Sequence, residues 1–333
     1  MRSSICREYG PPSSLGMADL PDPTPGPGQA VVEVAYAAVN FPDVLIIANK
    51  YQVSIPLPFV PGSEFSGTVS ALGVGGDAGP IRVGDRVFGS VMNGAFADKV
   101  VVDVGSLHRL PEQLRLDQAA AFWVTHATAY HSLRSVAEVT AGERVLVLGA
   151  AGGVGLAAVT LARQLGAEVF AAASTDEKLE VCQRAGATAL LNYGSTDLRT
   201  ALKEIAPDGV DVVIDPVGGP LAEKALRALR WKGRFVTVGY ASGEIPRIPL
   251  NLVLLKGCIV KGFEVRTFSH FEPILADRDQ RELLELLAKG VIDPHISSIH
   301  ELDELPDALD KVAGRRSTGK VLVRMKDARS HTR

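Results

Sequence analysis

A short run of glycines near the middle of the chain has residue types that can hold a phosphate group. The run Gly149-Ala150-Ala151-Gly152-Gly153-Val154-Gly155 follows a β-branched and leucine-rich stretch, residues 144–148, and leads into an apolar stretch, residues 156–165. This change of periodicity predicts a strand, a tight turn and a helix. Backbone N–H groups of such a turn can approach a pyrophosphate, and the helix N-terminus favours its charge. We therefore expect a dinucleotide-binding turn, although Ala150 replaces the first glycine of the usual G-x-G-x-x-G pattern.

The end of the next predicted strand, residues 168–173, indicates which dinucleotide would bind. An Asp or Glu about 20 residues after the glycines typically holds the ribose 2′-hydroxyl of NAD. Ser174 stands there instead, followed by Thr175 and Lys178. Hydroxyl groups and a cation favour a 2′-phosphate, so we expect NADPH. We interpret the nearby Asp176 as a residue that stabilises the first turn of a helix, not as a ribose ligand.

The order of the expected elements predicts an α/β protein of two domains. Short strands separated by glycine turns before about residue 120 indicate a mainly β, barrel-like domain. From residue 144 onward strands alternate with helices, which requires crossover connections and a doubly wound parallel sheet. Its last strand is expected at residues 258–263. A helix at 278–289, another at 305–313 and a strand at 320–324 follow, and the C-terminal part is expected to rejoin the first domain.

Composition excludes several classes of protein. The 333 residues are 46% hydrophobic with a net charge of −3, and no clustered Lys/Arg face is evident, so neither a nucleic acid nor a membrane is expected as a partner. Three cysteines, Cys6, Cys182 and Cys258, are too few for a disulfide framework or a four-cysteine zinc lobe. The N-terminus is polar and proline-rich instead of apolar, which predicts a cytoplasmic protein.

Several motifs, in order along the chain, resemble the zinc-free quinone oxidoreductase (ζ-crystallin-like) branch of the medium-chain dehydrogenase/reductase superfamily. They are Asn40-Phe41-Pro42-Asp43, residues 57–67, 84–87 and 94–97, Thr128-Ala129-Tyr130, the glycine turn, Asn192-Tyr193 and Gly319-Lys320. The resemblance implies a GroES-like catalytic domain, residues 1–122 and 265–333, and a Rossmann NADPH-binding domain, residues 123–264. It also implies a homodimer that pairs edge to edge through residues 259–263.

The resemblance also implies three catalytic residues, Asn40, Asp43 and Tyr51. Asn40 matches the active-site Asn of the family, and Tyr51 matches a Tyr that enoyl-thioester reductase relatives place near the substrate as a proton source. Two alternatives stay open. Tyr51 could be a packing aromatic in a loop, and Asn40 could be a turn residue with Asp43 as its capping partner.

Cofactor-binding residues are implied in the same way. Lys178 and Tyr193 match positions that meet the 2′-phosphate, and Arg315 is a third such contact. Matches to positions that line the cofactor are Thr128, Ala151, Gly152, Gly153, Val154, Ser174, Gly239 and Ser242. The glycines among them could instead serve turn geometry alone.

Zinc ligands of the superfamily are missing from this chain. The zinc enzymes carry a Cys in the segment matching residues 40–43 and a His before the Glu that matches Glu64, where this chain has Ser63. Without a metal ion, hydrogen-bond donors alone must stabilise the negative charge that develops on the substrate oxygen. Conjugated substrates suit such a site, because they spread this charge. The implied function is NADPH-dependent reduction of quinones or α,β-unsaturated carbonyls. The alternatives are an enoyl-thioester reductase and an NADPH-binding structural or RNA-binding crystallin-like protein without turnover.

Overall fold

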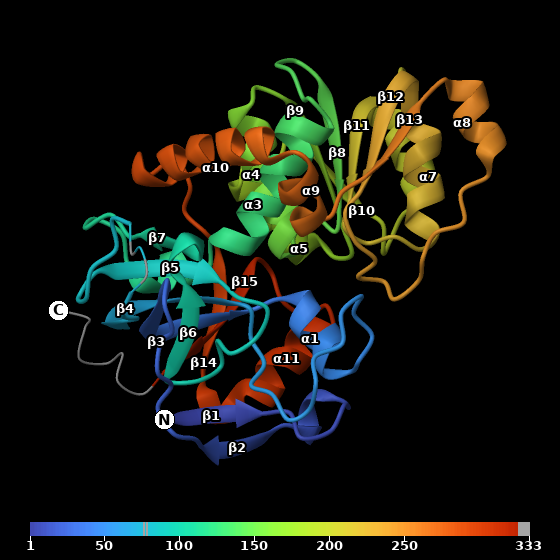
Figure 1. The fold of residues 1–333 in the computed structure, drawn as a ribbon. Coiled ribbons are helices and arrows are strands. Elements are labelled where there is room, and N and C mark those ends of the chain that lie inside the picture. Colours follow the sequence, from blue (N-terminus) through green and yellow to red (C-terminus); the bar gives the residue numbers. More distant parts are fainter. Residues whose placement is uncertain (76, 78, 326–333) are drawn as a thin grey trace. The chain divides into compact units, whose positions relative to one another are not determined.

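The computed structural model describes residues 1–75, 77 and 79–325 (Figure 1). The chain forms two compact units. The first contains residues 1–124 and the C-terminal segment from Asp293, and the second contains residues 125–292.

The first unit is built on a mostly antiparallel sheet of seven strands in the order β14-β15-β3-β4-β5-β7, with β6 paired to β3. The strands of this sheet are β3 Gln29–Val39, β4 Glu64–Leu72, β5 Arg86–Ser90, β6 Lys99–Asp103, β7 Leu107–Arg109, β14 Ile296–Glu301 and β15 Lys320–Arg324. β1 Arg2–Ile5 and β2 Gly16–Asp19 form a separate two-stranded sheet in the same unit. Its helices are α1 Phe41–Ile47, α2 Leu116–Ala120 and α11 Leu305–Ala313, with short 3₁₀ turns at Pro12–Ser14, Val104–Ser106 and Leu302–Glu304. α3, Trp123–His131, runs from this unit into the second.

The long strand β3 organises the core of the first unit. Its apolar residues, Val32 and Val34 among them, are buried in one cluster with side chains from α1 and α11. β15 pairs antiparallel with β3, with Val321 opposite Val39. The prediction that the C-terminal strand rejoins the first domain is therefore confirmed.

The second unit holds a sheet of six parallel strands in the order β10-β9-β8-β11-β12-β13. The strands are β8 Arg144–Leu148, β9 Glu168–Ala173, β10 Ala189–Asn192, β11 Val210–Asp215, β12 Leu229–Thr237 and β13 Ile259–Gly262. Its helices are α4 Gly153–Gln164, α5 Asp176–Arg184, α6 Leu198–Ile205, α7 Pro220–Ala228, α8 Leu250–Lys256, α9 Val265–Phe271 and α10 Pro273–Ala288, with a π-helical turn at Ser132–Val136. The strand order reverses at β8, which is the doubly wound arrangement and confirms the expected α/β class.

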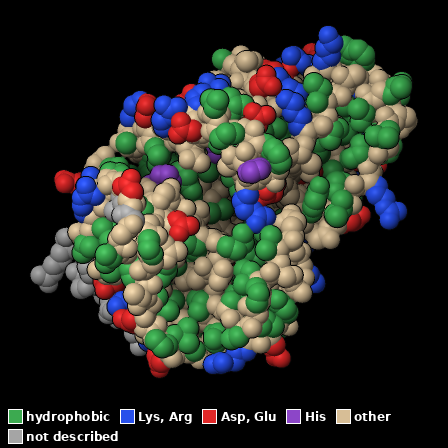
Figure 2. All heavy atoms as spheres, viewed as in Figure 1, with side chains coloured by type: hydrophobic (Ala, Val, Ile, Leu, Met, Phe, Trp, Pro, Cys, Tyr) green, Lys and Arg blue, Asp and Glu red, His purple; other side chains and the backbone are tan. Residues whose placement is uncertain are grey.

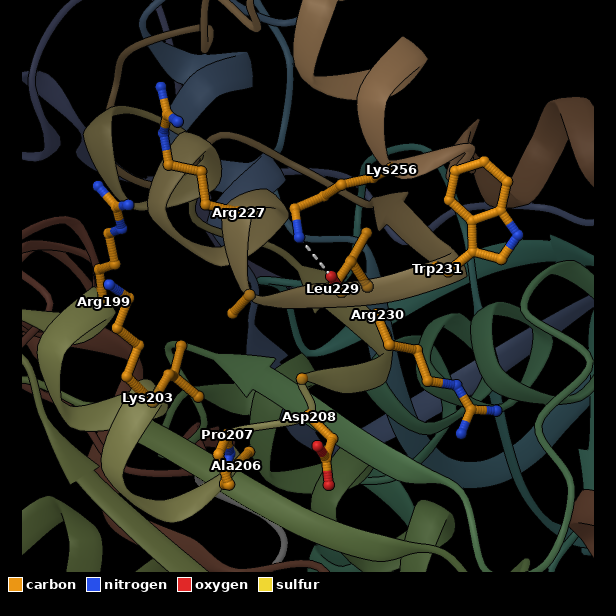
Figure 3. Close-up of a pocket in the computed structure, with 13 residues that line it drawn as sticks. Arg199, Lys203, Ala206, Pro207, Asp208, Arg227, Leu229, Arg230, Trp231 and Lys256 are labelled. Atoms are coloured by element: carbon orange, nitrogen blue, oxygen red, sulfur yellow. Dashed lines mark hydrogen bonds between the residues drawn. The ribbon is translucent and has the colours of Figure 1, made fainter.

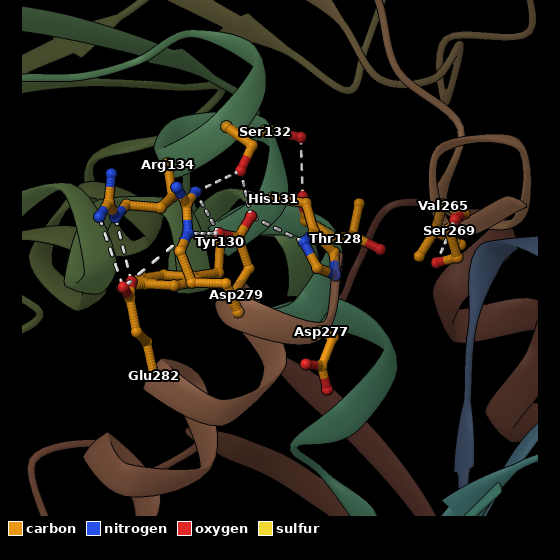
Figure 4. A network of polar contacts seen from close by, with 12 residues as sticks. Thr128, Tyr130, His131, Ser132, Arg134, Val265, Ser269, Asp277, Asp279 and Glu282 are labelled. Carbon is orange, nitrogen blue, oxygen red and sulfur yellow. Dashed lines mark hydrogen bonds and ion pairs between the residues drawn. The ribbon is translucent and has the colours of Figure 1, made fainter. Parts of the chain in front are cut away.

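Residues 265–292 lie in the second unit, whereas the expected boundary placed everything after 264 in the first domain. Polar contacts tie α10 to the end of α3 and the turn after it (Figure 4). His131 Nδ1 and Ser135 Oγ lie 3.0 and 2.5 Å from the buried carboxylate of Asp279. The Tyr130 hydroxyl donates to Glu282 at 2.7 Å. These contacts join segments about 150 residues apart, which no local sequence pattern reports.

No helix in the described part of the chain is both long and apolar enough to cross a membrane. Cys6, Cys182 and Cys258 are all buried and free.

Candidate functional site

The glycine turn closes between the end of β8 and the start of α4. Gly149 has a φ of +56°, a left-handed conformation that glycine adopts without steric cost. A Cβ atom on Gly155 would lie 2.3 Å from the Gly149 carbonyl oxygen, so that position admits no side chain. The Gly152 N–H donates to the same oxygen at 2.9 Å. Ala151, Gly152, Gly153 and Val154 thus form the turn and the first residues of α4, at the carboxyl edge of the sheet.

The tip of β9 places a cation beside a hydroxyl group. Lys178 Nζ donates to Ser174 Oγ at 3.0 Å, and the Thr175 side chain caps α5 by accepting from the Lys178 N–H. The Asp176 carboxylate instead accepts from Asn192 Nδ2 at 2.7 Å. Asp176 is the first residue of α5, which agrees with its interpretation as a residue at the start of the helix. Its carboxylate is also bonded to a side chain at the end of β10. Tyr193 follows directly, and its N–H donates to the Ala173 carbonyl at 3.0 Å.

Gly239 and Ser242 both lie in the loop that follows the carboxyl end of β12. The Ser242 N–H donates to the Val217 carbonyl at 2.9 Å, so the loop after β12 lies along the loop after β11. Asp215 fixes that second loop, because its Oδ1 accepts from the N–H groups of Val217 and Gly218 at 2.9 and 2.8 Å. Burial raises the pKa of Asp215.

Thr128 lies in α3, where its carbonyl accepts from Ser132 Oγ at 2.7 Å. Arg315 follows α11 in the first unit, whereas the predicted cofactor residues from Thr128 to Ser242 lie in the second. Its N–H donates to the Val312 carbonyl at 3.0 Å.

The first unit contains a buried polar network around Asn40. Lys320 Nζ donates to Asn40 Oδ1 at 2.6 Å and to Glu64 Oε2 at 2.9 Å. Asn40 Nδ2 donates to the same Glu64 oxygen at 3.0 Å, and the Val124 N–H donates to Glu64 Oε1 at 2.8 Å. Glu64 is fully buried and Lys320 is 3% exposed. Both ends of the Asn40 amide are therefore held in one orientation.

Glu64 and Lys320 are site residues that the sequence reasoning did not select. Each stood in a motif, but only as a mark of family resemblance. The signal that could have found them is a charged residue at the first position of a strand that is expected to be buried, since Lys320 opens β15 and Glu64 opens β4.

Asp43 caps α1 from inside the core. Its Oδ2 accepts from the Asn40 N–H at 2.8 Å, which is the capping role that the sequence left open. The carboxyl is 1% exposed, and burial raises its pKa to about 7, with a smaller contribution from the Glu64 charge. A carboxyl group that titrates near neutral pH can hold or release a proton under physiological conditions.

Tyr51 lies in the loop after α1 and packs, half-buried, against the core of the first unit. The loop is fixed on both sides, because the Lys50 N–H donates to the Leu45 carbonyl at 2.8 Å and the Tyr9 hydroxyl donates to the Ile55 carbonyl at 2.7 Å. Tyr51 thus has the packing contacts of the alternative that the sequence left open. Its role as a proton source stays a prediction.

Replacing Asp43 with asparagine is expected to change how stability depends on pH. The folded pKa of about 7 lies above the unfolded value of 3.8, so the folded state holds a proton that the unfolded state releases. Wild-type stability therefore falls as the pH rises between these two values. From pH 5 to pH 8 the wild type should lose about 2–3 kcal/mol relative to Asp43→Asn. Urea unfolding of both proteins at the two pH values measures this, and an equal change in both would contradict it.

Among the described residues, no group of three or more His, Cys, Asp or Glu side chains is arranged to hold a metal ion. Position 63, where the resemblance places a zinc ligand in the metal enzymes, is Ser63.

Comparisons with known proteins agree with these two units. Residues 26–112 match the family model of the alcohol dehydrogenase GroES-like domain, and residues 153–287 match that of the zinc-binding dehydrogenase. The chain is 37% identical to the mouse quinone oxidoreductase-like protein 2 over 98% of its own length and 92% of that protein. It belongs to the quinone oxidoreductase family of medium-chain dehydrogenases/reductases. The predicted resemblance is confirmed.

Solved structures give the same result. The Escherichia coli quinone oxidoreductase complexed with NADPH superposes with a TM-score of 0.89 at 28% identity, over 97% of this chain and all of that one. The Thermus thermophilus quinone oxidoreductase, also described in complex with NADPH, gives 0.85 at 32% identity over the same shares. The human synaptic vesicle membrane protein VAT-1 homolog is 33% identical over 90% of this chain and 80% of its own length. The fold thus serves proteins with different names, and fold alone does not choose a substrate.

Proposed function

We propose that this chain is an NADPH-dependent, zinc-independent reductase of quinones or α,β-unsaturated carbonyls. The observation that carries the proposal is the pairing of a glycine turn before α4 with a cation, Lys178, at the tip of β9. Two solved relatives in the family are complexes with NADPH, which supports the same cofactor here.

The residues of the second unit fit this cofactor. Within the Gly149–Gly155 turn, Gly155 leaves no room for a Cβ, and the turn presents the N-terminus of a twelve-residue helix to a pyrophosphate. Lys178 and Ser174 would hold the 2′-phosphate, with Tyr193 beside them. The Asp176 carboxylate is held by Asn192, and Lys178 supplies the opposite charge beside Ser174. When bound, NADPH supplies a hydride.

In the first unit, Asn40 and Tyr51 are the proposed donors toward the substrate oxygen. The Asn40 amide is oriented by Glu64 and Lys320, so one of its two N–H bonds is used. Among the described residues, the acceptor for the other is the Ala38 carbonyl 3.5 Å away, which is too far for a strong bond. Asn40 can therefore donate to an oxyanion without losing its orientation. Asp43, with its pKa near 7, accepts from the backbone N–H of Asn40 and can hold a proton beside this residue.

Zinc independence follows from the residues that replace zinc ligands. Asn40–Asp43 contains no Cys and Ser63 stands in place of a His. Hydrogen bonds alone then stabilise the developing charge, and conjugated substrates spread that charge onto a carbonyl oxygen. This is why quinones and enones are proposed ahead of simple alcohols or ketones.

A panel of acceptors tests the proposal. NADPH oxidation would be followed with 1,4-benzoquinone, a 2-alkenal and crotonyl-CoA. Turnover of the quinone or the alkenal is the expected result. A clear preference for crotonyl-CoA would assign the chain to the enoyl-thioester reductases. Tight NADPH binding without turnover of any acceptor would favour the non-catalytic NADPH-binding protein.

Tyr51→Phe tests the proton donor. Loss of the hydroxyl is expected to lower kcat by about 100-fold or more, which is the usual contribution of a positioned general acid to the rate. The KM for NADPH should change little. Tyr9→Phe is the matched control, because it removes a hydroxyl bonded to the other side of the same loop. Full turnover in Tyr51→Phe would leave Tyr51 with its packing role alone.

We also propose a homodimer paired through β13. This strand forms one edge of the six-stranded sheet, and Ile259 and Val260 on it are 48% and 44% exposed. Figure 2 shows further hydrophobic side chains over the neighbouring region of α8, where Leu250, Leu254 and Leu255 are exposed. An exposed apolar edge strand is a ready pairing surface.

Val260→Lys is expected to convert the dimer to a monomer, because a charge on the paired edge opposes pairing between two copies. Light scattering after size-exclusion chromatography measures the mass. Ile299→Lys, on the edge strand β14 of the other sheet, should leave the dimer intact. A wild type of monomer mass would contradict the proposed assembly.

A further inference from the structure

The second unit has a hollow at the amino-terminal edge of its sheet. Residues that precede β11 and the first residues of β12 line it, together with the face of α6 and the ends of α7 and α8. Its volume is about 350 Å³, within the range of about 300–1,000 Å³ for small-molecule sites. The glycine turn follows the carboxyl end of β8, so the two places lie at opposite edges of one parallel sheet. We name the hollow the cation pocket.

Its described lining carries five cationic side chains and one carboxylate, Asp208. The cations are Arg199, Lys203, Arg227, Arg230 and Lys256. Two of these are paired outside the lining, Arg227 with Glu223 and Arg230 with Asp211. Within the described part of the chain, Arg199, Lys203 and Lys256 have no acidic group within 4 Å.

The three unpaired cations come from two helices that face one space (Figure 3). Arg199 and Lys203 stand four residues apart on one face of α6, where like charges repel. Lys256, at the end of α8, is half-buried and donates to the Leu229 carbonyl at 2.6 Å. Burial lowers the pKa of Lys256, and the charges of Arg199 and Arg227 lower it further. Positive charge is thus gathered around the hollow at a cost to the folded state.

Helix capping accounts for only part of this arrangement. Lys203, Arg227 and Lys256 lie in the last turns of their helices, where a cation is favourable. Arg199 lies in the first turn of α6, where the helix dipole opposes a cation. The Lys256 ammonium contacts a carbonyl of β12 and not one of its own helix. An anion in the pocket would compensate all three charges at once.

We propose that the cation pocket binds a small molecule through a diphosphate group, held by Arg199, Lys203 and Lys256. Guanidinium groups match phosphate oxygens in pairs, and ammonium groups act as compact charges beside them. This site is independent of the proposed hydride transfer and distinct from the glycine turn.

Calorimetric titration of the full chain with inorganic pyrophosphate tests the proposal. Saturating NADPH is included so that the dinucleotide site is filled. One pyrophosphate per chain is the expected result. The variant R199Q/K203Q should bind it at least 10-fold more weakly. R281Q/K289Q, which removes two exposed cations from α10 and its C-cap, should bind it like the wild type.

Two outcomes would overturn the proposal. One is pyrophosphate binding that disappears when NADPH is present, which would place it at the glycine turn. The other is equal affinity in R199Q/K203Q with a lower thermal stability, which would make these side chains helix caps. If the wild type binds no NADPH, the proposed function fails, while a pyrophosphate site sensitive to R199Q/K203Q would still stand.

A parallel titration with ADP identifies the source of the diphosphate. Equal affinity for ADP and pyrophosphate would assign recognition to the diphosphate alone. Tighter binding of ADP would indicate a nucleotide ligand, with the exposed indole of Trp231 beside the pocket available to the base. Binding of neither would contradict the site.

Discussion

Lys320→Met is expected to destabilise the protein by about 3–5 kcal/mol, because it leaves the charge of Glu64 buried without its cation. Glu64 is fully buried, and Lys320 contacts both its carboxylate and the Asn40 amide. The remaining Val124 N–H and Asn40 Nδ2 cannot supply a compensating charge. Urea unfolding of the two proteins measures the difference.

Lys289→Met is the matched control, since Lys289 pairs with Glu285 at an exposed position, and its cost should stay below about 1 kcal/mol. The double variant Glu64→Gln/Lys320→Met should recover much of the lost stability, because it removes both buried charges. If Lys320→Met costs no more than the control, the buried pair does not hold the network around Asn40.

Lys178→Ser is expected to raise the KM for NADPH by about 10- to 100-fold, which corresponds to the binding free energy of one charge-assisted hydrogen bond. The KM for NADH should not change, because NADH has no 2′-phosphate for the ammonium group to meet. Lys178 lies 3.0 Å from Ser174 at the tip of β9, so serine there keeps a polar group without the charge.

Arg184→Gln provides the control for Lys178→Ser, because it removes an exposed cation from the far end of the same helix, α5. It should leave both KM values unchanged. An unchanged preference for NADPH in Lys178→Ser would show that the 2′-phosphate is held elsewhere.

The sequence predicted the parts of the site that depend on neighbouring residues. The strand, turn and helix around Gly149–Gly155 are local, because the glycines are needed for one backbone path. The same holds for Ser174, which follows β9, and Lys178, which lies four residues later in the first turn of α5. The doubly wound sheet was predictable because strands and helices alternate regularly after residue 144.

Contacts between distant segments could not be predicted in this way. Glu64 and Lys320 are 256 residues apart, and nothing near either residue marks the other as its partner. The strand β14 contains Ser297, Ser298 and His300 and lacks a clear apolar pattern, so the sequence did not predict a strand there. β14 pairs with β15, and this pairing makes it a strand although its own residues do not predict one.

The expected domain boundary at 264/265 differs from the division into compact units at 292/293 for a related reason. α10 was expected as a helix at 278–289 and starts at Pro273, and its partner residues Tyr130 and His131 lie about 150 residues earlier. The cation pocket was also hidden, because its charges are spread over α6, α7 and α8 and no single segment is basic.

The most direct test of a zinc-independent NADPH reductase is NADPH oxidation with 9,10-phenanthrenequinone by protein dialysed against a chelator, with its zinc content measured on the same sample. The predicted result is turnover with NADPH, in preference to NADH, by protein that contains essentially no zinc. Turnover that appears only after zinc is restored would contradict it, as would no turnover by protein that binds NADPH.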